Sequence, residues 1–114
     1  MKYALRVTRS AWKDVDEQLE WMRDTASLAA ATRWYEAWWA KVATLERMPN
    51  ARAIALENRL IRGEVVRQLV AAGFRTLFLV RDEIVYVLHV RRASRRPTSR
   101  AEMRSRLDEL LGKG

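Results

Sequence analysis

The sequence predicts an α+β fold in which a helical hairpin packs on a small, largely antiparallel sheet, with elements in the order β-α-α-β-β-β. Two observations predict this fold. Apolar residues recur at helical spacing through two consecutive segments near the N-terminus, and three strand-like runs with short connections follow in the second half of the chain. The chain has 114 residues, 49% of them hydrophobic, which suits one packed core, so we expect a single domain over residues 1–114.

The first three predicted elements form the N-terminal part of the chain. Residues 2–8 alternate weakly between polar and apolar side chains and include Tyr, Val and Thr, which predicts a short strand. Ser10 is the expected N-cap of an amphipathic helix over residues 10–24, and Ser27 is that of a second helix, which Pro49 ends. Because the link between the helices is short, we expect an antiparallel hairpin.

The second half of the chain predicts the rest of the sheet and a tail. Residues 50–63 are expected to form a loop with one helical turn around residues 54–60. Three runs rich in Val, Leu, Phe, Tyr and Ile then predict strands joined as antiparallel hairpins; these strands are residues 64–70, 74–81 and 84–91. The tail begins as a basic loop, and Ser99 is the expected N-cap of a short helix through Leu111.

The residue inventory excludes several kinds of site. The chain has no cysteine, which excludes disulfides, thiolate metal sites and cysteine nucleophiles. His89 is the single histidine, which argues against a histidine-rich metal cage, and we expect no metal ion and no cofactor. No apolar run is long enough for a signal peptide or a membrane span, so we expect a cytoplasmic protein with no membrane partner.

The net charge of +8 is concentrated in one stretch. Residues 91–106 hold seven arginines and one acid, Glu102, which gives +6 of the +8. A basic surface is either simply solvated or faces an acidic partner, which is a nucleic acid or an acidic protein segment. The densest part of the stretch favours a functional patch, whose arginines are Arg91, Arg92, Arg95 and Arg96.

Three segments of the sequence carry a family resemblance. They are Val-Val-Arg-Gln-Leu-Val around Arg67, Gly-Phe-Arg-Thr-Leu-Phe-Leu-Val around Arg75, and Ile-Val-Tyr-Val-Leu-His-Val-Arg-Arg around His89. With the order of elements, they resemble the RelE/ParE superfamily of bacterial toxins. Arg67 matches the family's Arg-x-Leu strand motif, and Phe74-Arg75-x-Leu-Phe matches its Tyr-Arg-x-Leu-Tyr motif. The resemblance covers about residues 2–97 and leaves residues 98–114 as a basic tail.

The long hairpin and the Arg-x-Leu motif look more like the ParE branch of this superfamily. That resemblance implies a toxin of a type II toxin–antitoxin module that inhibits DNA gyrase without being an enzyme. It also implies a cognate antitoxin that neutralises the toxin in a hetero-oligomer. The alternatives are a RelE-like endoribonuclease that cleaves mRNA on the ribosome and a degenerate basic interaction module without toxicity.

For the nuclease alternative, the residues that could carry the chemistry are Arg75, His89, Arg92 and Arg95. Two departures from the family pattern weaken it. Arg92 stands where many ParE-like sequences have a histidine just after the last strand. The chain has no tyrosine after Tyr86, so the usual RelE-type proton-transfer group is missing.

Arg75 needs an explanation, because a guanidinium in a hydrophobic strand must reach solvent, a carboxylate or a phosphate. If its face of the sheet meets the helices, an acid such as Glu64 or Glu83 must pair with it. If its face is open, it joins Arg67 in a basic groove. His89, which is expected to alternate along its strand with Val87, is interpreted first as a structural histidine and second as a catalytic one.

The tryptophans are interpreted mainly as core. Trp34 and Trp39 lie at the two margins of the apolar stripe on the second helix, and Trp21 lies opposite the apolar face of the first. Some aromatic surface is therefore expected to remain open to a partner, and the antitoxin is expected to dock on the sheet face away from the hairpin or in the hairpin's groove. The residues expected to bind target or antitoxin are Arg67, Arg75, Arg91, Arg92, Arg95, Arg96, Trp34 and Trp39.

Overall fold

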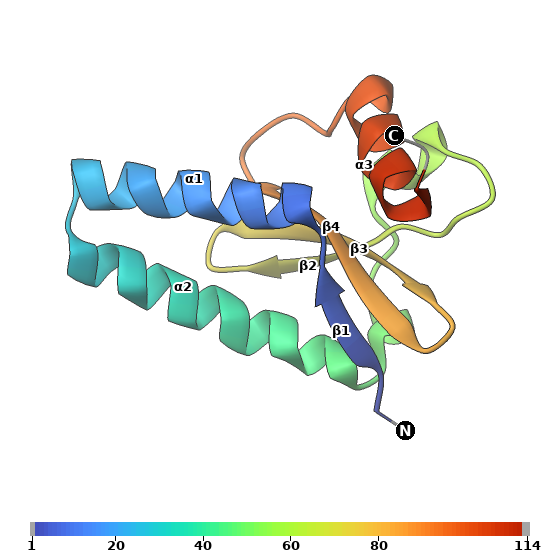
Figure 1. Ribbon diagram of the computed structural model, residues 1–114, viewed down its shortest axis with the longest axis horizontal. Coiled ribbons are helices and arrows are strands. Elements are labelled where there is room, and N and C mark those ends of the chain that lie inside the picture. The colour runs from blue at the N-terminus through green and yellow to red at the C-terminus, as the bar shows by residue number, and fades with distance from the viewer. Residues whose placement is uncertain (1, 113–114) are drawn as a thin grey trace.

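A computed structural model describes residues 2–112 and confirms the predicted α+β fold (Figure 1). The elements in chain order are β1 (Ala4–Val7), α1 (Arg9–Thr25), α2 (Leu28–Ala43), β2 (Arg67–Ala71), β3 (Phe74–Arg81), β4 (Ile84–Arg92) and α3 (Arg100–Leu111). Short 3-10 helices η1 (Thr44–Glu46), η2 (Pro49–Ala51) and η3 (Leu56–Leu60) occupy the segment between α2 and β2. No helix among these described residues is long and apolar enough to cross a membrane.

The four strands form one sheet in the order β1-β4-β3-β2. The pairs β2/β3 and β3/β4 are antiparallel and β1/β4 is parallel, so the sheet is largely antiparallel, as predicted. Two-residue turns join the antiparallel strands, at Ala72-Gly73 and at Asp82-Glu83. All four turn residues have positive φ, between 50° and 78°, as expected for the type I′ turns that suit the twist of a hairpin.

Helices cover both faces of the sheet. The α1/α2 hairpin packs on one face, where Trp38 and Val42 meet Phe78 and Val87. The other face carries a second apolar cluster, in which α3 and η3 cover Leu77, Leu79 and Leu88 (Figure 1). The open sheet face that we expected as an antitoxin dock is therefore occupied by the chain's own C-terminal helix, because Met103 and Leu107 bury their side chains there.

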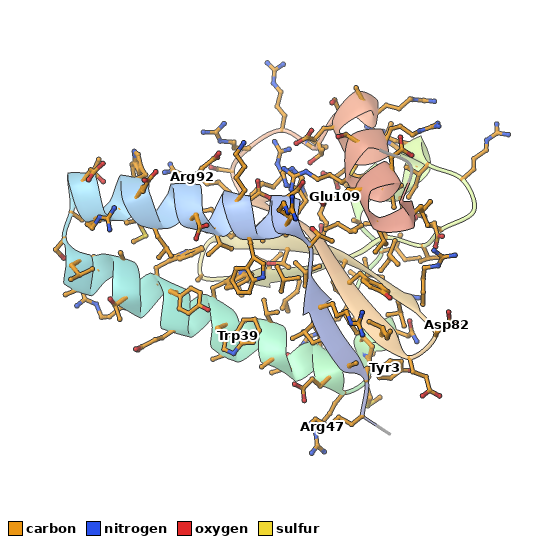
Figure 2. All side chains as sticks on the ribbon, viewed as in Figure 1. Tyr3, Trp39, Arg47, Asp82, Arg92 and Glu109 are labelled. Atoms are coloured by element: carbon orange, nitrogen blue, oxygen red, sulfur yellow. The ribbon has the colours of Figure 1, made fainter. Side chains whose placement is uncertain are left out.

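The helix ends confirm two of three predicted caps. The side chains of Ser27 and Ser99 cap α2 and α3, as predicted. Helix α1 begins at Arg9, one residue earlier than predicted, and its N-cap is Thr8, whose Oγ1 accepts from the backbone N–H of Ala11 at 3.2 Å. Ser10 instead donates its hydroxyl to Glu109 Oε1 at 2.7 Å, which ties the start of α1 to α3 (Figure 2).

Two stretches of the chain depart from the predicted boundaries. Helix α2 ends at Ala43 and passes into η1, before Pro49 can end it. Strand β2 begins at Arg67, three residues later than predicted. The backbone of the preceding residue, Val66, is hydrogen-bonded to the loop instead. Its N–H donates to Asn58 Oδ1 at 2.9 Å, and its carbonyl accepts from the backbone N–H of Ala55.

A β-bulge interrupts the pairing of β3 with β4. Leu77 lies opposite His89, but the next residue, Phe78, lies opposite Val87, so Leu88 is an extra residue in β4. The expected alternation of His89 with Val87 is therefore wrong. Val87 faces the hairpin with Phe78, whereas His89 shares the other face with Leu77.

Candidate functional site

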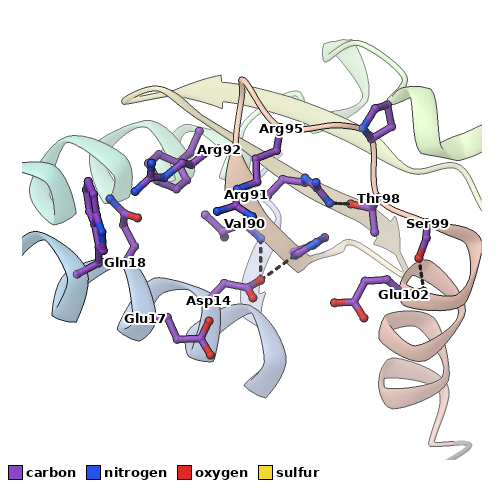
Figure 3. Close-up of a pocket in the computed structure, with 14 residues that line it drawn as sticks. Asp14, Glu17, Gln18, Val90, Arg91, Arg92, Arg95, Thr98, Ser99 and Glu102 are labelled. Carbon is purple, nitrogen blue, oxygen red and sulfur yellow. Dashed lines mark hydrogen bonds and ion pairs between the residues drawn. The ribbon is translucent and has the colours of Figure 1, made fainter.

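A cavity of about 570 Å³ lies where β4 ends (Figure 3). Three parts of the chain form its walls, namely α1, the last residues of β4, and the segment that leads into α3. Strand β1 pairs with β4 only as far as Val87, so the edge of β4 beyond that residue is free to meet α1. The cavity therefore brings together residues that are far apart in the sequence, and its basic side chains are Arg91, Arg92 and Arg95.

Asp14 of α1 is the centre of the polar contacts at this cavity. Its Oδ2 accepts from the backbone N–H of Val90 at 3.0 Å and lies 2.8 Å from His89 Nδ1 (Figure 3). Both its oxygens accept from Arg106 of α3, at 2.7 and 2.9 Å. Burial by itself would raise the pKa of Asp14, but the hydrogen bonds from His89, Arg106 and Val90 outweigh it and lower the pKa. The carboxylate thus joins α1, β4 and α3.

The contact with Asp14 fixes the proton of His89. An ionised carboxylate only accepts hydrogen bonds, so Nδ1 of His89 carries the proton in this pair. In a neutral ring the lone pair is then on Nε2, which is the usual arrangement of a histidine that accepts a proton. His89 is 7% exposed and lines the cavity, and its contact with Asp14 holds the ring in one orientation there.

Two arginines of the predicted patch, Arg91 and Arg92, contact other side chains of the protein. Arg91 Nη1 donates to Thr98 Oγ1 at 2.5 Å, and its buried Nε has no hydrogen-bond partner among residues 2–112. Burial lowers the pKa of Arg91. The guanidinium of Arg92 lies 4.2 Å from the ring centroid of Trp21, which is a cation–π contact.

The remaining two patch arginines are exposed in the loop after β4. Arg95 lines the cavity, and Arg96 is outside it. An anion that entered the cavity would therefore meet Arg91 and Arg92, whose guanidinium groups are held by Thr98 and Trp21, and the exposed side chain of Arg95.

Arg75 is 8% exposed and forms a buried ion pair with Glu57 of η3. Its Nη1 and Nη2 donate to the two carboxylate oxygens at 2.9 and 2.5 Å, and its Nε donates to Gln68 at 3.0 Å. Neither predicted partner is correct, since Glu83 lies in the far hairpin turn and Glu64 pairs with Arg81 at 3.6 Å. All three guanidinium nitrogens of Arg75 are used, so this residue is not available for an anion.

Glu57 is fully buried and also accepts from the backbone N–H of Thr98 at 2.8 Å. Burial would raise the pKa of this carboxyl, but the hydrogen bonds from Arg75 and Thr98 lower it from 4.5 to about 2. The pair therefore fixes the segment before α3 against the sheet.

Arg67 and Arg75 do not form the basic groove that was the alternative for Arg75. In β2 and β3, Arg67 lies opposite Phe78 on the hairpin side, whereas Arg75 lies opposite Val70 on the α3 side. Arg67 Nη1 donates to the carbonyl of Arg52 at 2.7 Å. It therefore holds the preceding loop against the edge of the sheet.

The tryptophans are mostly core, as predicted, with one correction. Trp34 is 8% exposed and packs between Trp38 and Phe74, with ring centroids 6.1 and 5.0 Å away, so its expected exposure at the margin is wrong. Trp39 is 37% exposed, on the outer side of α2, and stacks on Trp12 (Figure 2). Trp21 is 50% exposed beside the cavity.

Sequence reasoning misses Asp14, Glu57 and Arg106. Asp14 is one of several acids near the start of α1, and nothing local separates it from the others. Arg106 did leave a signal, because it lies between Met103 and Leu107 on the apolar side of the tail helix, where a charge needs a partner.

Comparisons of the sequence with protein-family models and with curated proteins give no match. The structure is similar to a chain in a solved structure described as the chromosomal ParDE TA system from P. aeruginosa. The TM-score is 0.68 at 22% sequence identity, and the match covers 80% of this chain and 96% of that one. This likeness shows that the chain has the fold of a component of that ParDE structure.

Proposed function

We propose that this protein is the toxin of a type II toxin–antitoxin module, of the ParE branch, that acts in the cytoplasm by inhibiting DNA gyrase and is neutralised by a cognate antitoxin. The observation that carries the proposal is the fold likeness to a chain of the ParDE structure, which extends over 96% of that chain. The motif resemblance supports it independently, since Arg67 and Phe74-Arg75 occupy the adjacent strands β2 and β3.

Surface features support binding to other macromolecules. Trp21 and Trp39 leave aromatic surface exposed on the hairpin, and Arg95 and Arg96 are exposed after β4. These residues are our candidates for contacts with gyrase or with the antitoxin, together with Arg91 and Arg92 at the cavity.

The test is induction in a bacterial host followed by a supercoiling assay with purified gyrase. Growth arrest and inhibited supercoiling are the expected results. Replacing Arg95 and Arg96 with Ala should weaken both and leave the fold intact, because exposed arginines contribute little to stability. The matched control removes two charges from the hairpin, with Arg23→Ala and Arg33→Ala. Growth arrest with normal supercoiling would contradict the gyrase target, and no growth arrest would favour the interaction module without toxicity.

A second candidate function is the RelE-like endoribonuclease, and the Asp14–His89 pair favours it. His89 at an arginine-lined cavity could move a proton during cleavage of a phosphodiester, while Arg92 and Arg95 stabilise the developing charge. Arg75 takes no part in this mechanism, because its guanidinium is already paired with the carboxylate of Glu57. Primer extension on mRNA after induction separates the two candidates: new cleavages that disappear in His89→Gln would favour the nuclease.

A further inference from the structure

A second cavity lies on the other side of α3 from Asp14. It has a volume of about 460 Å³ and is formed by the segment after η3 and the outer flank of α3, and we call it the α3 cavity. Four arginines line it, namely Arg59, Arg62, Arg100 and Arg104, and all four are exposed. None of them belongs to the arginine patch or to the cavity at the end of β4.

The four arginines have no acidic partner among residues 2–112, where no carboxylate oxygen lies within 4.0 Å of their nitrogens. Two acids line the α3 cavity: Glu64 pairs with Arg81, and Asp108 lies one helical turn after Arg104 without an ion pair among residues 2–112, so four positive charges face two negative ones there. Arg100 and Arg104 are one helical turn apart, a spacing at which like charges repel. An anionic ligand would remove this repulsion.

This arrangement differs from that of three other arginines of the structure. Arg75 is paired with the buried carboxylate of Glu57, Arg106 with the half-buried carboxylate of Asp14, and Arg92 lies over Trp21. Each of those arginines has a partner within the chain. In the α3 cavity, by contrast, four arginines lie close together and none of them forms an ion pair among residues 2–112.

Apolar side chains form the floor of the α3 cavity. Leu107 is buried there, Leu60 and Ile61 are half-buried, and Leu111 is 37% exposed. No aromatic side chain is among the described residues that line it. Single-stranded nucleic acids are generally held by aromatic stacking along a basic groove, so a leucine floor favours a protein ligand. Guanidinium groups bind carboxylates in a two-pronged geometry.

We propose that the α3 cavity binds an acidic segment of a partner protein, whose carboxylates pair with the four arginines and whose branched apolar side chains pack on the leucine floor. The proposal follows from charge and lining alone and does not depend on the proposed function. It makes the C-terminal tail a binding element as well as a cover for the sheet.

The test titrates the full chain with a short fluorescein-labelled peptide in which glutamate and leucine alternate, read by fluorescence anisotropy. In the variant R59Q/R62Q/R100Q/R104Q we expect binding to be about 10- to 100-fold weaker. The matched control, R6Q/R23Q/R33Q/R47Q, changes four exposed arginines outside the cavity and has the same net charge. Its binding should change by no more than about 3-fold. Circular dichroism checks that both variants are folded.

The apolar floor has a separate test. Leu111→Ser should weaken binding of the glutamate–leucine peptide about 3-fold or more and leave binding of a glutamate–serine peptide unchanged. Equal losses in the two quadruple variants, or no binding of either peptide by the unaltered chain, would overturn the proposal. So would a single-stranded RNA of matched length that binds the α3 cavity more tightly than the glutamate–leucine peptide, since that would assign the cavity to nucleic acid.

Discussion

Glu57 and Asp14 hold the C-terminal part of the chain against the sheet from two different places. Glu57 accepts from the backbone of Thr98, just before α3, and Asp14 accepts from Arg106 within α3. Both carboxylates also have partners on the sheet, which are Arg75 for Glu57 and His89 and the backbone N–H of Val90 for Asp14. Two acids from distant segments thus both hold α3 and the residues before it on the sheet, where Met103 and Leu107 are the buried apolar side chains of α3.

The two carboxylates differ in what surrounds them. Glu57 is fully buried, and protein groups occupy both its oxygens. Asp14 is at the wall of a cavity, and its partner His89 lines that cavity too. A change at Glu57 should therefore act chiefly on stability and reach the cavity only through Thr98, whereas a change at Asp14 should alter both stability and the candidate site directly.

The largest expected effect is at the Glu57 pair. Arg75→Met leaves the carboxylate of Glu57 buried without its cation, which should lower the free energy of unfolding by about 3–5 kcal/mol. Urea denaturation measures this. The double variant that adds Glu57→Gln should recover part of the loss, because no charge is then buried; a double variant less stable than the single one would contradict this account.

Acid should weaken the same pair. The pKa of Glu57 is about 2 in the folded chain against an ordinary 4.5, so its contribution is complete above the ordinary value and is lost as the pH falls from there toward 2. The loss should be about 3 kcal/mol, since each pKa unit corresponds to about 1.4 kcal/mol. Urea denaturation at decreasing pH measures it. The pKa of Asp14 is also lowered, so it acts in the same direction. In Glu57→Gln this part of the pH dependence should disappear.

A smaller loss is expected at the other carboxylate. Asp14→Asn removes the charge that faces Arg106 and should lower the free energy of unfolding by about 2–3 kcal/mol. It should also change any activity that uses His89, because Nδ1 loses its anionic acceptor. The matched control is Asp16→Asn on the same helix, which is exposed and should change stability by less than about 0.5 kcal/mol. Equal losses of unfolding free energy in Asp14→Asn and Asp16→Asn would show that the contacts of Asp14 do not stabilise the fold.

The smallest effect is expected far from both carboxylates. Glu83 has φ of 65° in the turn between β3 and β4, where a side chain is strained and glycine is preferred. Glu83→Gly should therefore raise the free energy of unfolding by about 0.5–1 kcal/mol. Thermal denaturation would detect the rise, and a fall would mean that Glu83 makes a contact that outweighs the strain.

Local sequence signals predict the order of elements and two of the helix caps. Ser27 and Ser99 act within three residues of themselves, and the strand runs differ clearly in composition from the helices. Local signals also indicate that Arg75 needs an acid. They cannot identify Glu57, because the contact depends on how the loop between α2 and β2 folds over the sheet.

The candidate site is less predictable for the same reason. Asp14 and His89 are 75 positions apart, and they meet only because β1 stops short and leaves the edge of β4 to α1. The position of α3 depends on Arg106, whose partners lie 92 and 18 positions away. Tertiary contacts at such separations leave no periodic pattern in the sequence.

The extra residue of β4, Leu88, is not needed for the pairing of β4 with β3 and contacts α3 instead. Leu88 is unpaired in the ladder, and its carbonyl accepts from Arg106 Nη1 at 3.0 Å while its side chain lies under α3. Deleting Leu88 would restore regular pairing without turning His89 or Val87 to the opposite face. The pairing of β3 with β4 should persist in such a variant, whereas α3 would lose the Leu88 contacts that hold it on the sheet.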